Sequence, residues 1–331
     1  MKKLINKPDM FVSDFLEGIL RAHGDVLGTA GNDTRAIVKK DVPAGKVAIV
    51  TGGGSGHLPL FLGYVGKGLA DACAVGNVFA SPSAKVMYDA AKATERGAGV
   101  LFLFGNYGGD RMNFELASED LEDDGIQVRR VICNDDIASA SEAEKQKRRG
   151  IAGIMFAYKI AGAAAEKMLP LDEVARLAEK ARDNTRTMGV ALSACTLPEV
   201  GTPSFEIAED EMEIGMGIHG EPGIRRGKLQ EADAVAEDLC SPILKELDIK
   251  AGDEVAVLVN GLGATPKEEL YIVYRKVDEI LQGVGAKIDY KLIGEYSTSM
   301  EMAGMSVSMM KLDEELKELL HKEAVSPFMV L

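Results

Sequence analysis

Cysteine is scarce in this sequence, and long apolar runs are absent. The 331 residues include four cysteines, none of them in a CxxC spacing, so the pattern of a disulfide framework or a zinc site is missing. No window approaches the roughly 18 consecutive apolar residues that span a bilayer. The N-terminus carries lysines but no apolar stretch of signal-peptide length. We therefore expect a soluble cytoplasmic protein whose thiols are buried.

Basic charge is also in short supply. Lysine and arginine together number 38 against 52 aspartate and glutamate residues, which gives a net charge of −14. Such a chain repels nucleic acid and anionic lipid, and no basic stripe offsets the repulsion. We expect no nucleic-acid partner and no membrane partner. The length and the 46% hydrophobic content are enough for two medium-sized cores, so two domains are expected.

The third absence is a nucleotide-binding signature. The glycine-rich stretch GGGSGH (52–57) lacks the lysine and the spacing of a P-loop, and His57 stands where the last glycine of GxGxxG would be. The stretch follows an apolar run, 46–51, which predicts a strand that leads through a bare turn to a helix. Backbone N–H groups in such a turn can approach a small polar ligand near a helix N-terminus, although glycine turns are as often structural.

Further apolar runs alternate with helical stretches. Residues 99–104 and 128–133 are typical of strands, and 83–97 is typical of a helix. This alternation predicts βα units around a mainly parallel sheet, in which ligands gather at the carboxyl ends of the strands. The loops that begin at Gly52 and Gly105 would then lie on the same rim of the sheet.

The second half of the chain repeats the α/β pattern. Residues 151–186 predict two helices, and 188–196 predicts a strand. There follow a strand at 255–259, a helix at 267–282 and strands near Tyr290 and Ser306. We predict an α/β fold of two domains, each with a mainly parallel or mixed sheet flanked by helices. The boundary is placed near residue 185, which gives domains 1–185 and 186–331.

Three polar residues in glycine-dense loops are candidates for a functional site. They are His57, His219 and Asp110, the last at the end of GNYGGD; His23 and His321 lie in amphipathic or charged stretches and are expected at the surface. Three interpretations are open. The residues are unrelated, with Asp110 capping the helix after it; or they form a metal site of two histidines and a carboxylate; or they perform acid–base and nucleophilic chemistry.

Four longer motifs carry a resemblance to a known family. They are GGGSGH with the following FASP, GNYGGDRMNFE, the run from SACTLPEVG to IHGEPG, and VNGLGATPKEELY. Together they resemble the substrate-binding subunit of dihydroxyacetone kinases, the DhaK-like family, over nearly the whole chain. The resemblance implies two α/β domains, a homodimer, and a short-chain ketose held by a covalent hemiaminal bond to a histidine, here His219.

The resemblance also implies roles for other residues. Asp110 and His57 match the family's acid–base residues beside the ligand hydroxyl, which places them in the N-terminal domain and the covalent histidine in the C-terminal one. Gly54 and Ser81 match positions that contact the substrate, and Gly105 occupies a position that borders it.

The family's nucleotide site lies outside these residues. The resemblance implies a separate, all-helical, DhaL-like kinase subunit that binds ADP or ATP with magnesium, whereas this chain binds no cofactor and no metal. It implies that the chain alone is catalytically silent. The phosphoryl donor is either ATP or a protein of the phosphotransferase system.

The sequence departs from the family pattern at several positions near the site, among them Leu60, Phe61, Asn77 and Ala80, and two departures bear on the substrate. Leu58 replaces the glutamate that usually follows the histidine, and Gly105 stands where a lysine borders the ligand in family members. Losing a long cation removes a donor and frees volume, so a ketotetrose such as erythrulose is an alternative substrate. Two other functions are weighed: a DhaK-like, ligand-sensing transcriptional coactivator, and a metal-dependent lyase or aldolase.

Overall fold

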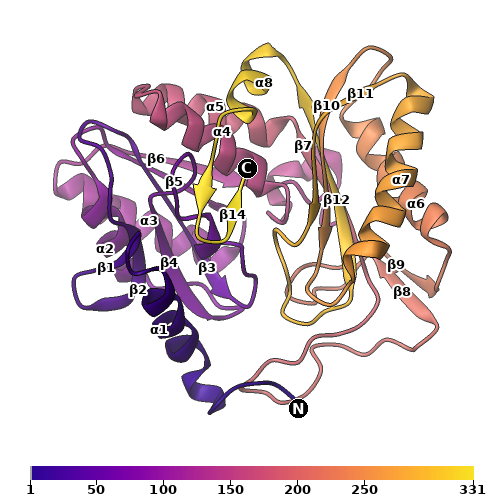
Figure 1. The fold of residues 1–331 in the computed structure, drawn as a ribbon, viewed down its shortest axis with the longest axis horizontal. Coiled ribbons are helices and arrows are strands. Elements are labelled where there is room, and N and C mark those ends of the chain that lie inside the picture. The colour runs from indigo at the N-terminus through magenta and orange to yellow at the C-terminus, as the bar shows by residue number, and fades with distance from the viewer. Residues whose placement is uncertain (1) are drawn as a thin grey trace.

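The computed structural model describes residues 2–331, which form five layers of helices and strands (Figure 1). Two six-stranded sheets stand side by side, with helices on the outer face of each and further helices between them. Across the molecule lie α2 (Ala84–Thr94) and α3 (Gly108–Asp123), the first sheet, α4 (Ile154–Glu166) with α5 (Leu171–Asp183) and α8 (Glu314–Leu320), the second sheet, and α6 (Ala232–Glu246) with α7 (Lys267–Val284). The predicted α/β class is confirmed.

The first sheet has the strand order β1-β2-β4-β3-β5-β6. Its strands are β1 (Leu27–Ala30), β2 (Asp33–Lys39), β3 (Ala48–Ser55), β4 (Ala72–Val78), β5 (Val100–Gly105) and β6 (Val128–Cys133), and α1 (Phe11–His23) precedes them. β4, β3, β5 and β6 are parallel, whereas β1 and β2 form an antiparallel hairpin. Successive strand residues face opposite sides, so Ile49 joins the core around α4 and Val50 joins the core around α2.

The second sheet has the order β11-β10-β12-β7-β8-β9. Its strands are β7 (Thr185–Ala191), β8 (Glu211–Ile214), β9 (Arg225–Lys228), β10 (Glu254–Gly261), β11 (Lys287–Gly294) and β12 (Gly304–Leu312). Only the pairing of β10 with β11 is parallel, so this sheet is mixed. The strand predicted at 188–196 begins and ends earlier, because its partner β12 begins at Gly304, opposite Ala191.

The helical layer between the sheets belongs to both halves of the chain. Every residue of α4 from Ile154 to Ala165 is buried. One continuous core runs from the first sheet through α4 to Ala256 and Leu258 of β10. Because this core joins the two sheets, the division of the chain into domains near residue 185 stays a prediction.

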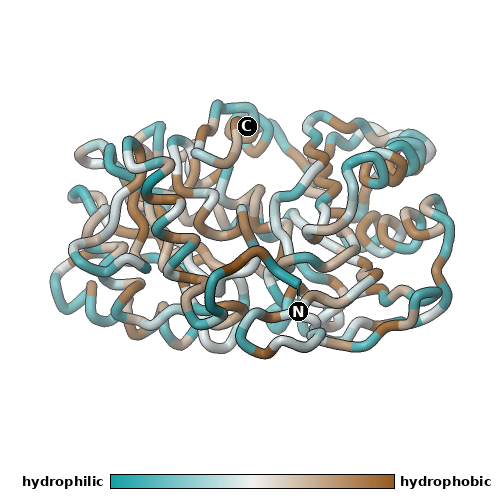
Figure 2. The backbone as a smooth tube through the Cα atoms, turned by 60° about the horizontal axis from the view of Figure 1, so that its bottom comes forward, coloured by the Kyte–Doolittle hydropathy of each residue, from teal (hydrophilic) through white to brown (hydrophobic). Residues whose placement is uncertain are grey.

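The C-terminal end of the chain returns to the first half. Helix α8 packs against α4, and the short strands β13 (Val325–Ser326) and β14 (Met329–Val330) form a hairpin in which Val325 bridges Lys67. Three 3-10 helices, η1 (Pro8–Met10), η2 (Leu62–Tyr64) and η3 (Glu142–Lys147), complete the elements of residues 2–331. Figure 2 shows apolar residues along the inner strands and helices and polar residues along many outer loops. Within the described residues, no helix combines the length and the apolar character needed to cross a bilayer.

The glycine-rich stretch is not the strand-to-helix turn that the sequence predicts. β3 continues through the glycines to Ser55, and the next α-helix begins only at Ala84. A Cβ atom at Gly53 would lie 2.1 Å from the ring of Phe61, and one at Gly54 would lie 2.6 Å from the backbone nitrogen of Ala80. The glycines are therefore strand residues on which neighbouring segments close directly, and the expected helix N-terminus at this position is wrong.

Candidate functional site

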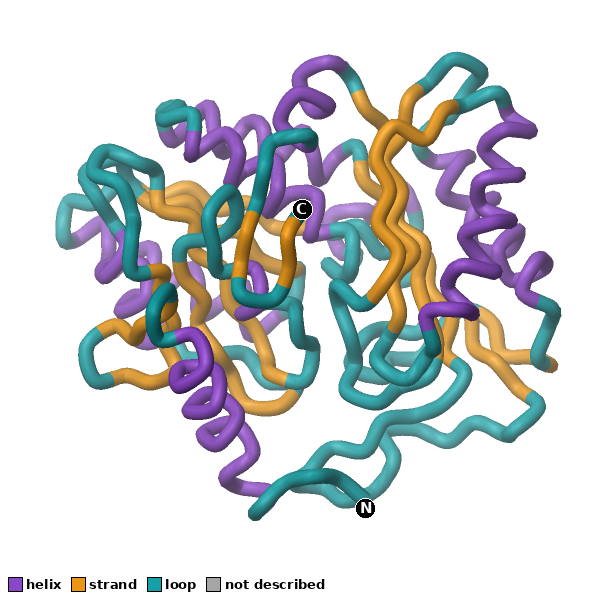
Figure 3. Tube along the Cα trace, viewed as in Figure 1, coloured by secondary structure: helices purple, strands orange, loops and turns teal. Residues whose placement is uncertain are grey.

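The structure brings His57, Asp110 and His219 together between the two halves of the chain. His57 follows β3, Asp110 lies in the first turn of α3 directly after β5, and His219 lies in the loop after β8. The imidazole centroids of His57 and His219 are 4.8 Å apart. Asp110 is close enough to His219 for the imidazole to lower the pKa of its carboxyl. Figure 3 shows long loops between and below the two sheets.

His57 is fully buried and held in one tautomer. Its Nδ1 lies 2.8 Å from the carbonyl oxygen of Thr298, and a carbonyl can only accept, so Nδ1 donates and Nε2 is a bare acceptor. The ring stacks on Phe79 at a centroid distance of 4.7 Å and an angle of 11°. Burial and the nearby His219 lower the pKa of His57 to about 3. The imidazole is therefore neutral at physiological pH.

The carbonyl that orients His57 is itself fixed by a motif of the second half. Oδ1 of Asn260 accepts hydrogen bonds from the backbone nitrogens of Tyr296 and Ser297, at 2.8 and 2.9 Å. The backbone nitrogen of Thr298 then donates to the carbonyl of His57 at 3.2 Å. The VNGLGATP motif thus positions a residue of the first half.

His219 is paired with Glu221. Its Nδ1 lies 2.9 Å from Oε1 of Glu221, and its backbone nitrogen donates to Oε2 at 3.0 Å. Burial alone would raise the pKa of Glu221, but the hydrogen bond with His219 and the charges of His219 and Arg149 lower it to about 2. An ionised carboxylate accepts, so Nδ1 carries a proton, and in the neutral form of the imidazole Nε2 has the free lone pair. An imidazole in this state is a nucleophile.

Aromatic side chains surround the His219 imidazole. The rings of Tyr107 and Phe79 stand edge-on to it at centroid distances of 4.8 and 5.2 Å. Phe79 has a positive φ of 57°, an uncommon conformation for a bulky residue, and its ring contacts both histidines. These walls restrict the access of water to the imidazole.

Asp110 is a buried carboxylic acid, with 6% of the residue exposed. Burial raises its pKa to about 6, against the lowering effects of a hydrogen bond with Ser81 and of the His219 imidazole. A carboxylate with this pKa is ionised at pH 7 and still basic enough to accept a proton from a reacting hydroxyl. Asp110 lies inside the first turn of α3, so it does not take the N-cap position itself, which belongs to Tyr107.

Unpaired polar atoms concentrate at this site. Among residues 2–331, five buried side-chain oxygen or nitrogen atoms have no hydrogen-bond partner, and three of these are His57 Nε2, Asp110 Oδ1 and Tyr107 Oη. A buried polar group without a partner costs about 1–3 kcal/mol, and folded proteins leave few of them. Their concentration beside the His219 imidazole indicates a site that can hydrogen-bond a small polar ligand.

The predicted substrate-contact residues lie around these groups. Gly54 packs on the Phe79–Ala80 backbone, and a Cβ atom at Gly109 would lie 2.6 Å from Oγ of Ser81, which places Ser81 against the start of α3. At Gly105 a Cβ atom would lie 3.3 Å from the ring of Tyr107. The volume expected beside Gly105 is thus partly filled by that ring.

Three site residues were not predicted from the sequence. Glu221 stands two positions after His219 in IHGEPG, and Tyr107 lies in GNYGGD, so both were within motifs already singled out. Thr298 gave no signal, because it contributes a backbone carbonyl.

The metal interpretation finds no support in the arrangement of side chains. In the part of the chain that the structure describes, no three His, Cys, Asp or Glu side chains are grouped so that they could hold a metal ion. His57 and His219 instead direct their Nδ1 atoms at a carbonyl and a carboxylate of the protein.

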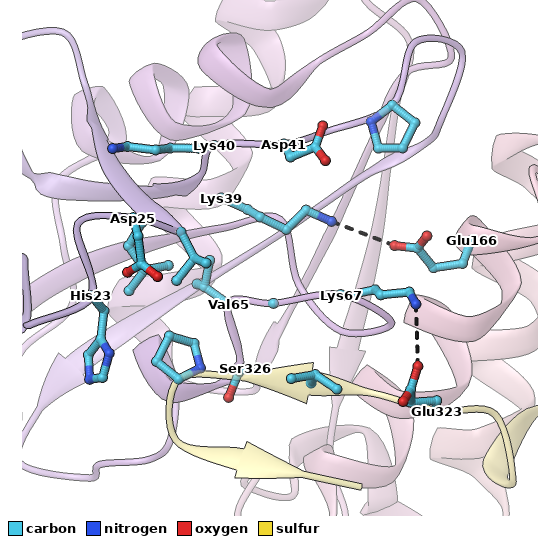
Figure 4. Close-up of a pocket in the computed structure, with 16 residues that line it drawn as sticks. His23, Asp25, Lys39, Lys40, Asp41, Val65, Lys67, Glu166, Glu323 and Ser326 are labelled. Carbon is cyan, nitrogen blue, oxygen red and sulfur yellow. Dashed lines mark hydrogen bonds and ion pairs between the residues drawn. The ribbon is translucent and has the colours of Figure 1, made fainter.

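A cavity of about 750 Å³ lies elsewhere, between β2 and the C-terminal hairpin (Figure 4). Two of its three lysines are ion-paired, Lys39 with Glu166 at 3.6 Å and Lys67 with Glu323 at 3.3 Å. None of the three candidate site residues lines it. We assign the chemistry to the His57, Asp110 and His219 cluster, where the unpaired buried atoms are.

Known proteins match this chain along nearly its whole length. The Dak1 domain family matches residues 17–328. The chain is 49% identical over 329 residues to the dihydroxyacetone-binding subunit DhaK of PTS-dependent dihydroxyacetone kinase 2 from Listeria innocua, with 99% of both chains covered. It is 44% identical over 332 residues to an L-erythrulose kinase from Pectobacterium atrosepticum. That match covers 99% of this chain and 56% of the kinase.

Solved structures show the same fold. The dihydroxyacetone kinase of C. freundii matches with a TM-score of 0.89 at 33% identity, over 98% of this chain and 59% of that one. The dihydroxyacetone kinase operon co-activator Dha-DhaQ matches with a TM-score of 0.88 at 31% identity, over 94% of this chain and 96% of that one. The chain therefore spans nearly all of the Listeria subunit and of the co-activator, and somewhat more than half of the two longer kinases. This chain belongs to the Dak1 domain family and is a DhaK-like protein.

Proposed function

We propose that this chain is the substrate-binding subunit of a dihydroxyacetone kinase and holds the ketose covalently on His219. The observation that carries the proposal is the pairing of His219 Nδ1 with Glu221 at 2.9 Å, which leaves Nε2 as a free nucleophile beside the buried base Asp110. The Listeria relative is a dihydroxyacetone-binding subunit that this chain matches over nearly its whole length, which supports dihydroxyacetone as the substrate.

Capture of the ketose is an addition without a leaving group. The Nε2 lone pair of His219 attacks the ketone carbon, the π electrons of the C=O bond move to its oxygen, and that oxygen takes up a proton from water to give a hydroxyl. The imidazole ring gains positive charge, which the Glu221 carboxylate stabilises. A polyol such as glycerol has no carbonyl carbon to attack, so the bond selects ketoses against polyols.

Asp110 and His57 then act on the ketose hydroxyl that receives the phosphoryl group. Asp110 takes the hydroxyl proton, since its pKa of about 6 suits a base working near neutral pH. His57, with a pKa of about 3, is too weak a base to keep that proton. Its bare Nε2 instead accepts a hydrogen bond from the ketose and orients it.

The phosphoryl group comes from a nucleotide on a second protein. We propose a helical, DhaL-like partner subunit that holds ADP or ATP with magnesium and supplies the electrophilic phosphorus. The PTS-dependent Listeria relative supports a phosphotransferase-system protein as the donor behind that nucleotide. We further propose that the chain works as a homodimer in the cytoplasm.

A ketotetrose is the second candidate substrate. Gly105 places no side chain at the border of the pocket, and the relative from Pectobacterium is named an L-erythrulose kinase. The coactivator function is less favoured, because a sensor needs His219 to hold its ligand but has less need of a base poised like Asp110.

Native intact-mass measurement tests the proposal. The protein is mixed with dihydroxyacetone, L-erythrulose or glycerol, and the hemiaminal is expected to add the full mass of the ketose, with no loss of water. We expect His219→Ala to lose the adduct, and His321→Ala, at an exposed histidine, to keep it. An adduct that persists in His219→Ala, or no adduct with any ketose, would refute the proposal. The larger adduct population identifies the preferred sugar.

A further inference from the structure

A series of three charged side chains, Glu221, Arg149 and Asp136, extends from His219. Glu221 bonds the imidazole through Oε1, and its Oε2 lies 3.6 Å from a terminal guanidinium nitrogen of Arg149. Nε of Arg149 donates to Oδ2 of Asp136 at 2.8 Å. Arg149 also donates to the carbonyl of Gly215, the residue that follows β8, at 3.2 Å. One guanidinium therefore contacts the loop of His219 near its beginning and near its end.

Asp136, the last of these three charged side chains, is held rigidly. Asp136 is 1% exposed, its backbone nitrogen donates to the carbonyl of Arg149 at 3.1 Å, and its Oδ1 accepts from the backbone nitrogen of Ala138 at 3.1 Å. The backbone nitrogen of Arg149 donates to Oγ of Ser139 at 2.9 Å. Backbone and side chain of Arg149 are thus fixed on the same segment, which leaves the guanidinium little freedom to move.

Gly217, in the loop of His219, lies where Glu221 and Arg149 approach each other. A Cβ atom at Gly217 would lie 2.1 Å from Oε2 of Glu221 and 2.4 Å from a terminal nitrogen of Arg149. Any side chain at this position would separate the carboxylate from the guanidinium. The loop thus has no side chain at the point where Glu221 and Arg149 approach each other.

We infer that Arg149, anchored by Asp136, is a positioning residue that holds the Glu221 carboxylate on Nδ1 of His219 and so keeps Nε2 free to attack the ketose. This inference rests on the proposed function. The Arg149 guanidinium and the backbone N–H of His219 both hold Oε2 of Glu221, so the carboxylate presents Oε1 to the imidazole in one direction. Without the guanidinium, only the backbone hydrogen bond restrains the rotamers of the Glu221 side chain. With Glu221 displaced, the imidazole proton can move to Nε2, and a protonated Nε2 is no nucleophile.

The chain offers a matched control for this role. Arg148, the preceding residue, is buried and forms a two-pronged ion pair, in which each terminal nitrogen lies 2.7 Å from one carboxylate oxygen of Glu246. That pair does not contact Glu221 or His219. Arg148→Met removes another ion-paired cation from the same segment, so it separates a general loss of stability from a loss of His219 orientation.

The experiment compares Arg149→Met, Arg149→Lys and Arg148→Met in the full-length chain by two readouts. The first is the rate at which the dihydroxyacetone adduct appears in native mass spectra. The second is the tautomer of His219, read from long-range ¹H–¹⁵N correlations of the ligand-free protein. We expect Arg149→Met to slow adduct formation about tenfold to a hundredfold, as outer-shell partners do for metal-bound histidines, and to shift the tautomer toward protonated Nε2. Arg149→Lys should restore part of both, and Arg148→Met should change neither.

The outcomes separate the two proposals. If the unaltered chain forms no adduct, the proposed function fails. If it forms the adduct and Arg149→Met forms it at the same rate with the same tautomer, the role of Arg149 is refuted. Should Arg149→Met not fold, Asp136→Asn tests the same link, because it weakens the anchor and keeps the size of the side chain; an unchanged rate and tautomer there also overturn the inference.

Discussion

The buried carboxyl of Asp110 lowers the free energy of unfolding at neutral pH. Its carboxyl is ionised in the unfolded chain above its ordinary pKa of 3.8, but burial raises the folded-state pKa to about 6. Below pH 3.8 both states are protonated, and the acid has no effect on the free energy of unfolding. As the pH rises through 6 the folded protein must ionise a buried acid, so stability is lost, and the full loss is present above that pH.

We expect Asp110→Asn to stabilise the protein at pH 8 by about 1–3 kcal/mol and to have little effect on stability near pH 3.5, because the amide removes the buried charge. The same variant should lose phosphorylation by the reconstituted kinase while keeping the ketose adduct. Urea unfolding at the two pH values and a coupled kinase assay measure both effects. A stability gain of equal size at both pH values would contradict the assigned burial of charge.

Individual site residues were predictable where a side chain has a chemistry of its own. His57 and Asp110 follow apolar runs that read as parallel strands, and His219 lies in a distinctive glycine loop, so their convergence could be expected. Glu221 was within reach, two residues from His219. Thr298 was not, because any residue supplies a carbonyl and this one is 241 positions from His57.

Strand β3 runs through the glycine-rich stretch that the sequence predicted as a turn. Three consecutive glycines are rare in strands, since they lower strand stability and often mark a close approach of other backbone. That approach is made by Phe61 on Gly53 and by the Phe79–Ala80 segment on Gly54. Such contacts depend on segments distant from the strand, which local pattern does not reveal. The second sheet is mixed, as the prediction of a mainly parallel or mixed sheet allows, but which of its strands pair antiparallel depends on distant segments in the same way.

We expect Gly53→Ala to destabilise the protein by about 1–3 kcal/mol, because the added methyl group overlaps the ring of Phe61 and overpacks the core. It should also weaken ketose capture, since Phe61 belongs to the loop after His57. Adding Phe61→Leu should recover part of the loss, and the double-mutant cycle measures that coupling by chemical unfolding. If the two substitutions are simply additive, the ring is not what requires a glycine at this position.

The two halves of the molecule contact each other through loops and the C-terminal hairpin as well as through the central helices. His57 is oriented by the carbonyl of Thr298, which lies in a loop of the second sheet. The C-terminal hairpin packs on the segment that follows His57. In that segment a Cβ atom at Gly66 would lie 2.2 Å from the carbonyl of Val325, and one at Gly68 would lie 2.6 Å from that of Glu323. The order of the segment that carries His57 thus depends on two segments of the second half of the chain.

Deleting residues 325–331 tests this dependence. Oγ of Ser326 donates to the carbonyl of Gly63 at 2.6 Å, and Val325 bridges Lys67, so the deletion exposes the backbone that follows the His57 loop. We expect a lower Tm and faster amide hydrogen exchange across residues 57–69, with slower ketose capture, because His57 loses the support of that segment. Val330→Ser, at a 77% exposed residue of the same hairpin, should leave all three unchanged. Unaltered exchange at 57–69 in the deletion variant would show that the hairpin covers the first half without ordering it.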